Sequence, residues 1–140
     1  MPNPAYAVTP DPAPARSGAL TPAKVTAAMR AVFRIMEAWG VTTEQARTLL
    51  GRPGRSTLFK WKRGEVSTAP YDTVRRISYI LGIYKILQIV FAVPEQADAW
   101  VQKPNAAFGG RSALEHMLGG DVTDLAAVRA YLDAVRGQGA

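Results

Sequence analysis

The sequence contains no cysteine and a single histidine, His116, among its 140 residues. Without thiols the chain cannot form disulfides or thiolate metal sites, and one imidazole is too few for a histidine-based zinc site or a catalytic triad. The acidic residues show no evident catalytic pairing, and Gly109-Gly110 lacks the preceding strand and the following Lys-Ser/Thr of a phosphate-binding loop. The sequence therefore predicts a non-enzymatic protein with no catalytic residues, no metal and no cofactor, and we expect His116 on a helix surface or at a cap.

The chain also has few long runs of apolar residues. The clearest one lies between residues 77 and 93, and Lys85 interrupts it near the middle. At about 17 residues, the run is at the lower limit for a membrane-crossing helix. A buried central helix over residues 74–93 is the favoured interpretation, and a homodimer interface along this helix is a further hypothesis. We expect a cytoplasmic protein with no membrane contact.

Residues 1–20 contain five of the ten prolines and, apart from alanine, few apolar side chains. Such a segment cannot bury enough surface to offset its ordering entropy, so we expect a disordered arm. The segment also lacks the basic start and the long apolar run of a signal peptide.

Positive charge is concentrated in the middle of the chain. The net charge is +6, and residues 44–76 carry eight basic groups against three acidic ones. Residues 94–140 carry four basic and six acidic groups. This distribution favours two surfaces for two kinds of partner, and the alternative is a basic face that is merely solvated.

Apolar residues recur at three- and four-residue spacing, and no alternating run typical of a strand is present. Thr21-Pro22 is a typical helix start, and Thr43 and Ser56 are candidate caps of two short helices. Further helices are expected after Pro70, from Pro94 to Trp100, from Ser112 to about residue 117, and from residue 123 to about residue 135. The predicted fold class is all-α.

The segments 43–50 and 56–63 have the lengths and the turn of a helix-turn-helix. On the second segment Leu58 and Trp61 share one face, which suits packing on the preceding helices, while polar donors occupy the other face as base edges and phosphates require. Arg52 and Arg55 lie in the turn, where we expect contacts with the sugar-phosphate backbone. The predicted DNA-binding residues are Arg52, Arg55, Ser56, Thr57, Lys60 and Arg63. An ordinary helical hairpin with a soluble exterior is the alternative.

The loop between Trp100 and Ser112 is more specified than a connector needs to be. It combines a Pro-Asn stop, an aromatic residue and a glycine pair that permits positive φ or close approach of a partner. Together with the segment 56–62, the following residues resemble antitoxins of the Xre/MbcA/ParS type over residues 22–138: Ala99-Trp100-Val101, Pro104-Asn105, Phe108-Gly109-Gly110-Arg111-Ser112, Leu114, Gly119-Gly120, Val128 and Tyr131-Leu132. Ala113 departs from the family, whose members commonly have proline there.

The resemblance implies a bacterial type II toxin–antitoxin system whose toxin has a RES domain and either consumes NAD or uses it for ADP-ribosylation. The C-terminal domain of the antitoxin would cover the toxin's NAD cleft, and the N-terminal domain would repress the operon. The implied architecture is a disordered arm at residues 1–20, a helix-turn-helix bundle for DNA binding and dimerisation at residues 21–93, and a small helical toxin-binding domain at residues 94–140.

The implied toxin-binding residues are Trp100, Asn105, Phe108, Gly109, Gly110, Arg111 and Ser112. Among them we expect Phe108 to be an exposed apolar anchor, whereas Trp100 fits the core as well as the interface. Arg111 can enter an acidic pocket of the toxin. The implied partners are a cognate RES-domain toxin, operator DNA and a second copy of the chain within a larger toxin–antitoxin complex. The alternative function is a stand-alone helix-turn-helix transcriptional regulator whose C-terminal domain only dimerises.

Overall fold

The computed structural model describes residues 21–66 and 68–139, so the expected disordered arm lies outside the described residues. The described residues form seven α-helices and no strand, which confirms the all-α class. The elements are α2 (Pro22–Ala38), α3 (Thr43–Leu49), α4 (Arg55–Lys62), α5 (Tyr71–Val90), α6 (Pro94–Ala99), the 3₁₀ turns η1 (Trp100–Gln102) and η2 (Ala106–Phe108), α7 (Ala113–Met117) and α8 (Val122–Gly139).

The helix starts follow local capping chemistry, with two corrections. Thr21 caps α2 as predicted, because its hydroxyl accepts a hydrogen bond from the backbone N–H of Lys24 at 3.3 Å. Thr42, not Thr43, caps α3, because only Thr42 has a glutamine three residues later to complete a capping box. Gly54, not Ser56, is the N-cap of α4, so this helix begins one residue before the predicted start.

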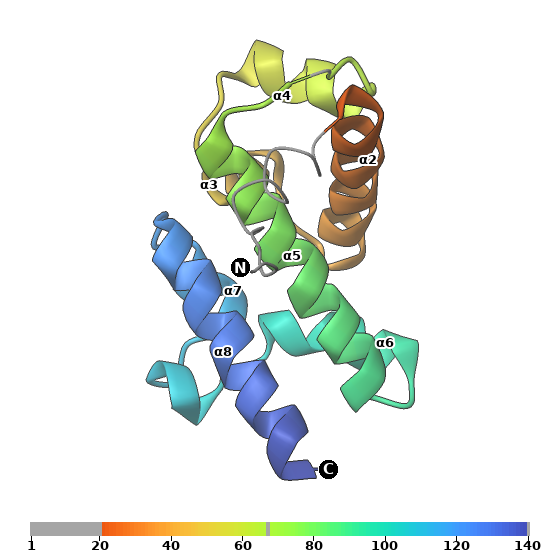
Figure 1. The fold of residues 1–140 in the computed structure, drawn as a ribbon. Coiled ribbons are helices and arrows are strands. Elements are labelled where there is room, and N and C mark those ends of the chain that lie inside the picture. Colours follow the sequence, from red (N-terminus) through yellow and green to blue (C-terminus); the bar gives the residue numbers. More distant parts are fainter. Residues whose placement is uncertain (1–20, 67, 140) are drawn as a thin grey trace, which may run out of the picture.

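The long helix α5 lies at the centre of the molecule. It packs on α2 on one side and on α8 on the other, and α8 runs alongside it in the same direction (Figure 1). Two helices with the same direction need a return path, which α6, the two 3₁₀ turns and α7 provide. The face of α5 that includes Ile77, Ile80, Ile83 and Leu87 is buried, as expected for a central helix. No helix in the described ranges is long and apolar enough to cross a membrane.

Arg76 of α5 connects the N-terminal helices to the C-terminal ones. Its side chain is buried, and the residue is 5% exposed. The guanidinium donates hydrogen bonds to the carbonyl oxygen of Thr48 at 3.1 Å, to that of Gly120 at 2.7 Å and to the carboxylate of Asp72 at 2.7 Å. A buried charge is tolerated only when it is paired and hydrogen-bonded. Arg76 is therefore a structural residue, although it belongs to the basic cluster of the sequence.

We predict that Arg76→Met lowers the free energy of unfolding by about 2–4 kcal/mol, because the buried carbonyl oxygen of Gly120, the part-buried one of Thr48 and the carboxylate of Asp72 each lose a hydrogen bond from the guanidinium. The matched control is Arg75→Met at the neighbouring exposed position, which should change stability by less than about 0.5 kcal/mol. Urea unfolding followed by circular dichroism measures both values. Equal stability of the two variants would contradict the bridging role of Arg76.

Candidate functional site

The pair α3 and α4 forms a helix-turn-helix whose apolar side chains pack as predicted. Leu58 and Trp61 of α4 are buried, with exposed fractions of 2% and 6%. They hold α4 against the other helices of the bundle, and α4 packs on α2. The opposite face of α4 is therefore turned to solvent.

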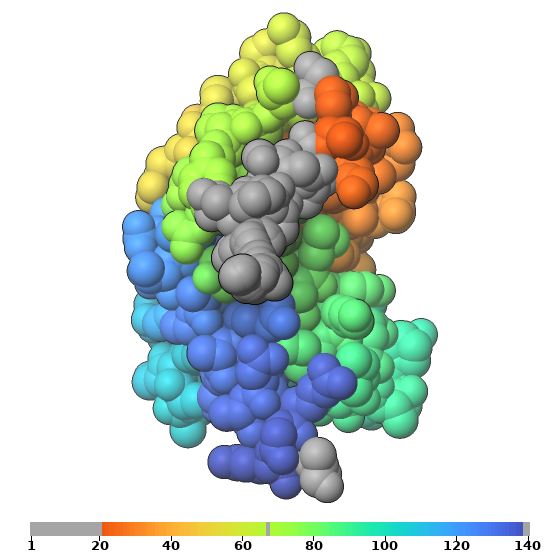
Figure 2. Space-filling model, in the orientation of Figure 1, coloured from red at the N-terminus to blue at the C-terminus, as the bar shows by residue number. Residues whose placement is uncertain are grey.

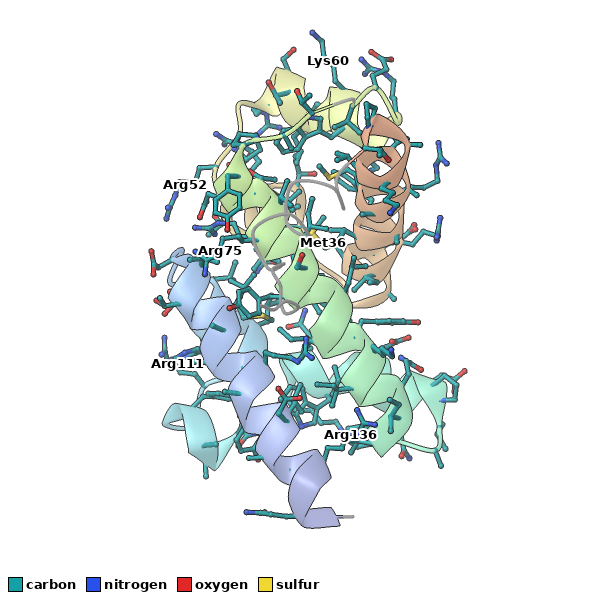
Figure 3. All side chains as sticks on the ribbon, viewed as in Figure 1. Met36, Arg52, Lys60, Arg75, Arg111 and Arg136 are labelled. Atoms are coloured by element: carbon teal, nitrogen blue, oxygen red, sulfur yellow. The ribbon has the colours of Figure 1, made fainter. Side chains whose placement is uncertain are left out.

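The outward face of α4 carries four of the predicted DNA-binding residues, all of them exposed: Ser56, Thr57, Lys60 and Arg63. Lys60 points away from the molecule at the end formed by α4 (Figure 3). Arg63 donates a hydrogen bond from Nε to the carboxylate of Glu65 at 2.8 Å. This bond holds the pKa of Glu65 below its ordinary value, and the carboxylate competes with any anionic partner for Arg63.

The two arginines predicted to meet DNA from the turn are both exposed, and each also lies against another part of the protein. Arg55 is the first residue of α4, and its guanidinium pairs with Glu44 of α3. Arg52 has a positive φ of 63°, and its side chain lies against Gly120, where a Cβ atom would come within 2.5 Å of Nη2. Figure 3 shows Arg52 beside the beginning of α5, well away from Lys60. The sequence could not reveal this, because Gly120 is distant along the chain.

The loop between α6 and α7 is closed by its own backbone. Pro104 and Ser112 form an isolated antiparallel bridge, and the N–H of Asn105 donates to the carbonyl oxygen of Arg111 at 3.0 Å. Gly110 donates back to the carbonyl oxygen of Asn105 at 3.0 Å. Gly109 and Gly110 have φ values of 68° and 87°, a region that glycine adopts without steric cost. The glycine pair is thus required by the turn.

Two polar residues predicted to bind a partner make hydrogen bonds inside the loop. The side chain of Asn105 accepts a hydrogen bond from the N–H of Ala107 at 2.8 Å and begins η2. Ser112 is buried and caps α7, with its hydroxyl accepting from the N–H of Glu115 at 3.0 Å. Both side chains shape the loop because their oxygens satisfy backbone donors at the starts of helical turns.

Phe108 is not the exposed anchor that its loop position predicted. The residue is 9% exposed and packs in an aromatic cluster. Its ring centroid lies 5.1 Å from that of His116, 5.4 Å from that of Tyr131 and 6.4 Å from that of Trp100. Trp100 is only partly buried and stacks on Tyr131 at 6.2 Å. Phe108 therefore ties the loop to α7 and α8, since an aromatic ring buries a large apolar area.

Gly109, Gly110 and Arg111 form the tip of the loop and are exposed, as are Ala106 and Ala107 before the buried Phe108. Neither glycine has another group within 4 Å of the position of a Cβ atom, so the backbone at the tip is open to an approaching partner. The Nη2 atom of Arg111 lies 3.4 Å from Nδ1 of His116. In the space-filling view the loop region lies along the lower left edge of the molecule, whereas α4 lies at the upper end (Figure 2).

Comparison with known families finds two matching models. Residues 14–82 match the helix-turn-helix domain of Xre-like antitoxins, and residues 87–137 match the C-terminal toxin-binding domain of Xre/MbcA/ParS antitoxins. The uncharacterized protein y4oB of Sinorhizobium fredii is 50% identical over 115 residues, which cover 82% of this chain and 88% of that protein. The chain belongs to the Xre/MbcA/ParS antitoxin family.

The match gives this antitoxin two functional regions that share one helix. The matched helix-turn-helix domain ends and the matched toxin-binding domain begins within α5. The loop of residues 104–112 lies in the toxin-binding domain, and α3 and α4 lie in the other domain. Antitoxin and helix-turn-helix families are generally non-enzymatic.

Sequence patterns did not reveal how Arg76, His116 and Tyr131 serve the antitoxin. Arg76 was one basic residue among eight, and only the carbonyl oxygens around it distinguish it. His116 is half-buried under the loop, where a cap or a surface position was expected. Tyr131 did carry a signal, because it belongs to the motif that the family shares, but its contact with Phe108 depends on the tertiary fold.

Proposed function

We propose that this antitoxin neutralises a RES-type toxin that consumes NAD or transfers ADP-ribose, by covering the toxin's active site with the loop of residues 104–112. The observation that carries the proposal is the closed and anchored loop whose tip exposes Gly109, Gly110 and Arg111. A loop already held in one conformation loses little entropy when it binds, which favours affinity. The proposal also uses the resemblance to antitoxins of RES-domain toxins described above.

Arg111 is the side chain best placed to enter the toxin. It is the one charged residue of the exposed tip, and a guanidinium pairs with carboxylates in two-pronged geometry. An NAD cleft that recognises ribose or orients a nucleophile with carboxylates would accept it. Phe108 and Trp100 support the tip, because the aromatic cluster to which they belong holds the backbone of the loop against the rest of the domain.

We predict that Arg111→Glu raises the dissociation constant for the cognate toxin at least about 30-fold, the size expected for a central arginine of an interface. The measurement is NAD loss catalysed by the purified toxin at increasing antitoxin concentration. Arg136→Glu is the matched control, because it makes the same charge change at an exposed site near the end of α8.

Full NAD turnover in the presence of excess parent antitoxin would overturn the proposed neutralisation. It would favour the alternative of a stand-alone transcriptional regulator. Equal inhibition by the parent and Arg111→Glu would instead retain neutralisation and remove Arg111 from the interface. The unfolding midpoint of the variant, measured in parallel, should equal that of the parent because Arg111 is exposed.

We further propose that α4 binds operator DNA and represses the antitoxin's own operon. The proposal is supported by the exposed hydroxyl and basic side chains of α4, which lie opposite its buried Leu58 and Trp61. Of the predicted contacts, Lys60 is the best placed, because it points straight out from this end of the molecule (Figure 3). Arg63 must first break its salt bridge with Glu65 before its guanidinium can contact DNA.

We predict that Lys60→Ala combined with Arg63→Ala weakens binding to the DNA upstream of the gene and lowers the magnitude of its salt slope by about 1 to 2, since each phosphate contact contributes about 0.9. Fluorescence anisotropy at several salt concentrations measures the slope. A double variant that binds as the parent does would show that α4 is not the recognition helix.

We also propose that the antitoxin forms a homodimer through the end of α5 and the turn that follows. Most of α5 is buried within the chain, but Ile89 is 50% exposed, Val90 is 37% exposed and Val93 is 42% exposed. No charged residue occurs between Lys85 and Glu95. An uncharged apolar patch of this kind is typical of a subunit interface.

We expect the parent antitoxin to sediment as a dimer at micromolar concentration and Ile89→Lys to sediment as a monomer. Tyr71→Lys is the matched control, because Tyr71 is also exposed but lies at the other end of α5. A monomeric parent would remove the proposed dimer. An Ile89→Lys variant that remains dimeric would place the dimer interface elsewhere.

A further inference from the structure

A groove lies beside the helix-turn-helix and is lined by α2, the start of α3 and α4. Its volume is about 280 Å³. Arg30 and Arg34 of α2 and Lys62 of α4 line it, together with the single acidic residue Glu37. The aromatic rings of Phe33 and Phe59 contribute to its apolar wall. None of the arginines of α2 was among the predicted DNA-binding residues.

The basic residues of this groove differ from those predicted in the turn. Within residues 21–66 and 68–139, Arg30, Arg34 and Lys62 form no salt bridge, whereas Arg55 pairs with Glu44 and Arg63 pairs with Glu65. A phosphate that binds a paired arginine must first displace a carboxylate, and one that binds an unpaired arginine need not. The groove therefore brings together three cations that a phosphate can reach without displacing a carboxylate from them.

The groove is continuous with the outward face of α4. Phe59 is 38% exposed and lines the groove, and it lies three residues after Ser56 and four before Arg63, so these side chains are neighbours on the helix. Arg30 extends to the end of α4, where a Cβ atom on Gly64 would lie 3.2 Å from its Nη2. When the outward face of α4 enters a major groove, this flank must meet the backbone of one DNA strand.

We infer that the groove between α2 and α4 is a binding site for the sugar-phosphate backbone of DNA, with Arg30, Arg34 and Lys62 contacting phosphates and Phe59 contacting deoxyribose. The inference rests on the proposed DNA binding by α4 and extends its footprint onto α2. It adds phosphate contacts on the flank of α4 to those predicted for Arg52 and Arg55, of which Arg55 is paired with Glu44. Such contacts position the protein on DNA without reading sequence.

The composition of the groove favours DNA over an acidic peptide. Three cations against one carboxylate suit a uniformly anionic strand, and the groove adjoins the helix that is proposed to read bases. The apolar wall is compatible with deoxyribose, whose ring faces are largely carbon. An acidic segment of the toxin with an apolar side chain is the other occupant that the experiment distinguishes.

The test uses the full chain with Arg30→Gln and Arg34→Gln, and two duplexes of equal length: the DNA upstream of the gene and a scrambled version of it. Anisotropy titrations at several salt concentrations give the affinity and the salt slope for each duplex. We expect the magnitude of the slope to fall by about 2 on both duplexes, since each lost phosphate contact removes about 0.9. The ratio of the two affinities should stay unchanged, because phosphate contacts carry no sequence information.

The matched control is Lys103→Gln with Arg136→Gln, which removes the same charge from exposed sites of the toxin-binding domain. Its salt slope should equal that of the parent. If the Arg30 and Arg34 variant keeps the parent slope while the parent binds DNA, the groove is not a phosphate site, although the proposed function stands. Loss of toxin inhibition by that variant would then identify the groove as a peptide site. If the parent binds neither duplex, the proposed DNA binding and the groove proposal both fail.

Discussion

The arrangement of this antitoxin depends on one buried guanidinium. Arg76 donates to the carbonyl oxygen of Thr48 near the end of α3 and to that of Gly120 just before α8, and Asp72 supplies the compensating charge from one turn earlier in α5. Hydrogen bonds are directional, so these contacts set the orientation of the two ends of the molecule as apolar packing alone would not. The hydroxyl of Thr73 adds a hydrogen bond to the carbonyl oxygen of Leu50 at 2.8 Å.

The same junction explains why glycine occupies position 120. Its φ is +97°, and a Cβ atom there would meet the guanidinium of Arg52 at 2.5 Å. A larger residue would be strained and would push against the helix-turn-helix. Through this junction the exposed face of α4 and the loop of residues 104–112 are held at opposite ends of one body (Figure 1).

In the loop of residues 104–112, most of the conspicuous residues of the motif shape the loop and are not displayed on its surface. Asn105 and Ser112 satisfy backbone donors, and Phe108 is buried against α7 and α8. What these residues present to a partner is the tip that they hold in place. In the basic cluster of residues 44–76, too, some charged side chains serve the fold: Arg76 is a structural residue and Arg55 pairs with an acidic side chain. Unpaired cations of α2, outside this cluster, lie beside α4.

The sequence by itself determined the helices, the helix-turn-helix and the family. Apolar periodicity, caps and glycine stops act over a few residues, so the all-α class, the burial of Leu58 and Trp61 and the central position of α5 could be predicted from local spacing. Only the tertiary structure decided which polar and aromatic residues remain available. Arg52 lies against Gly120, Arg76 reaches both Thr48 and Gly120, and Phe108 packs on Tyr131. Burial and charge pairing of these residues are set by groups far away along the chain, which local patterns do not encode.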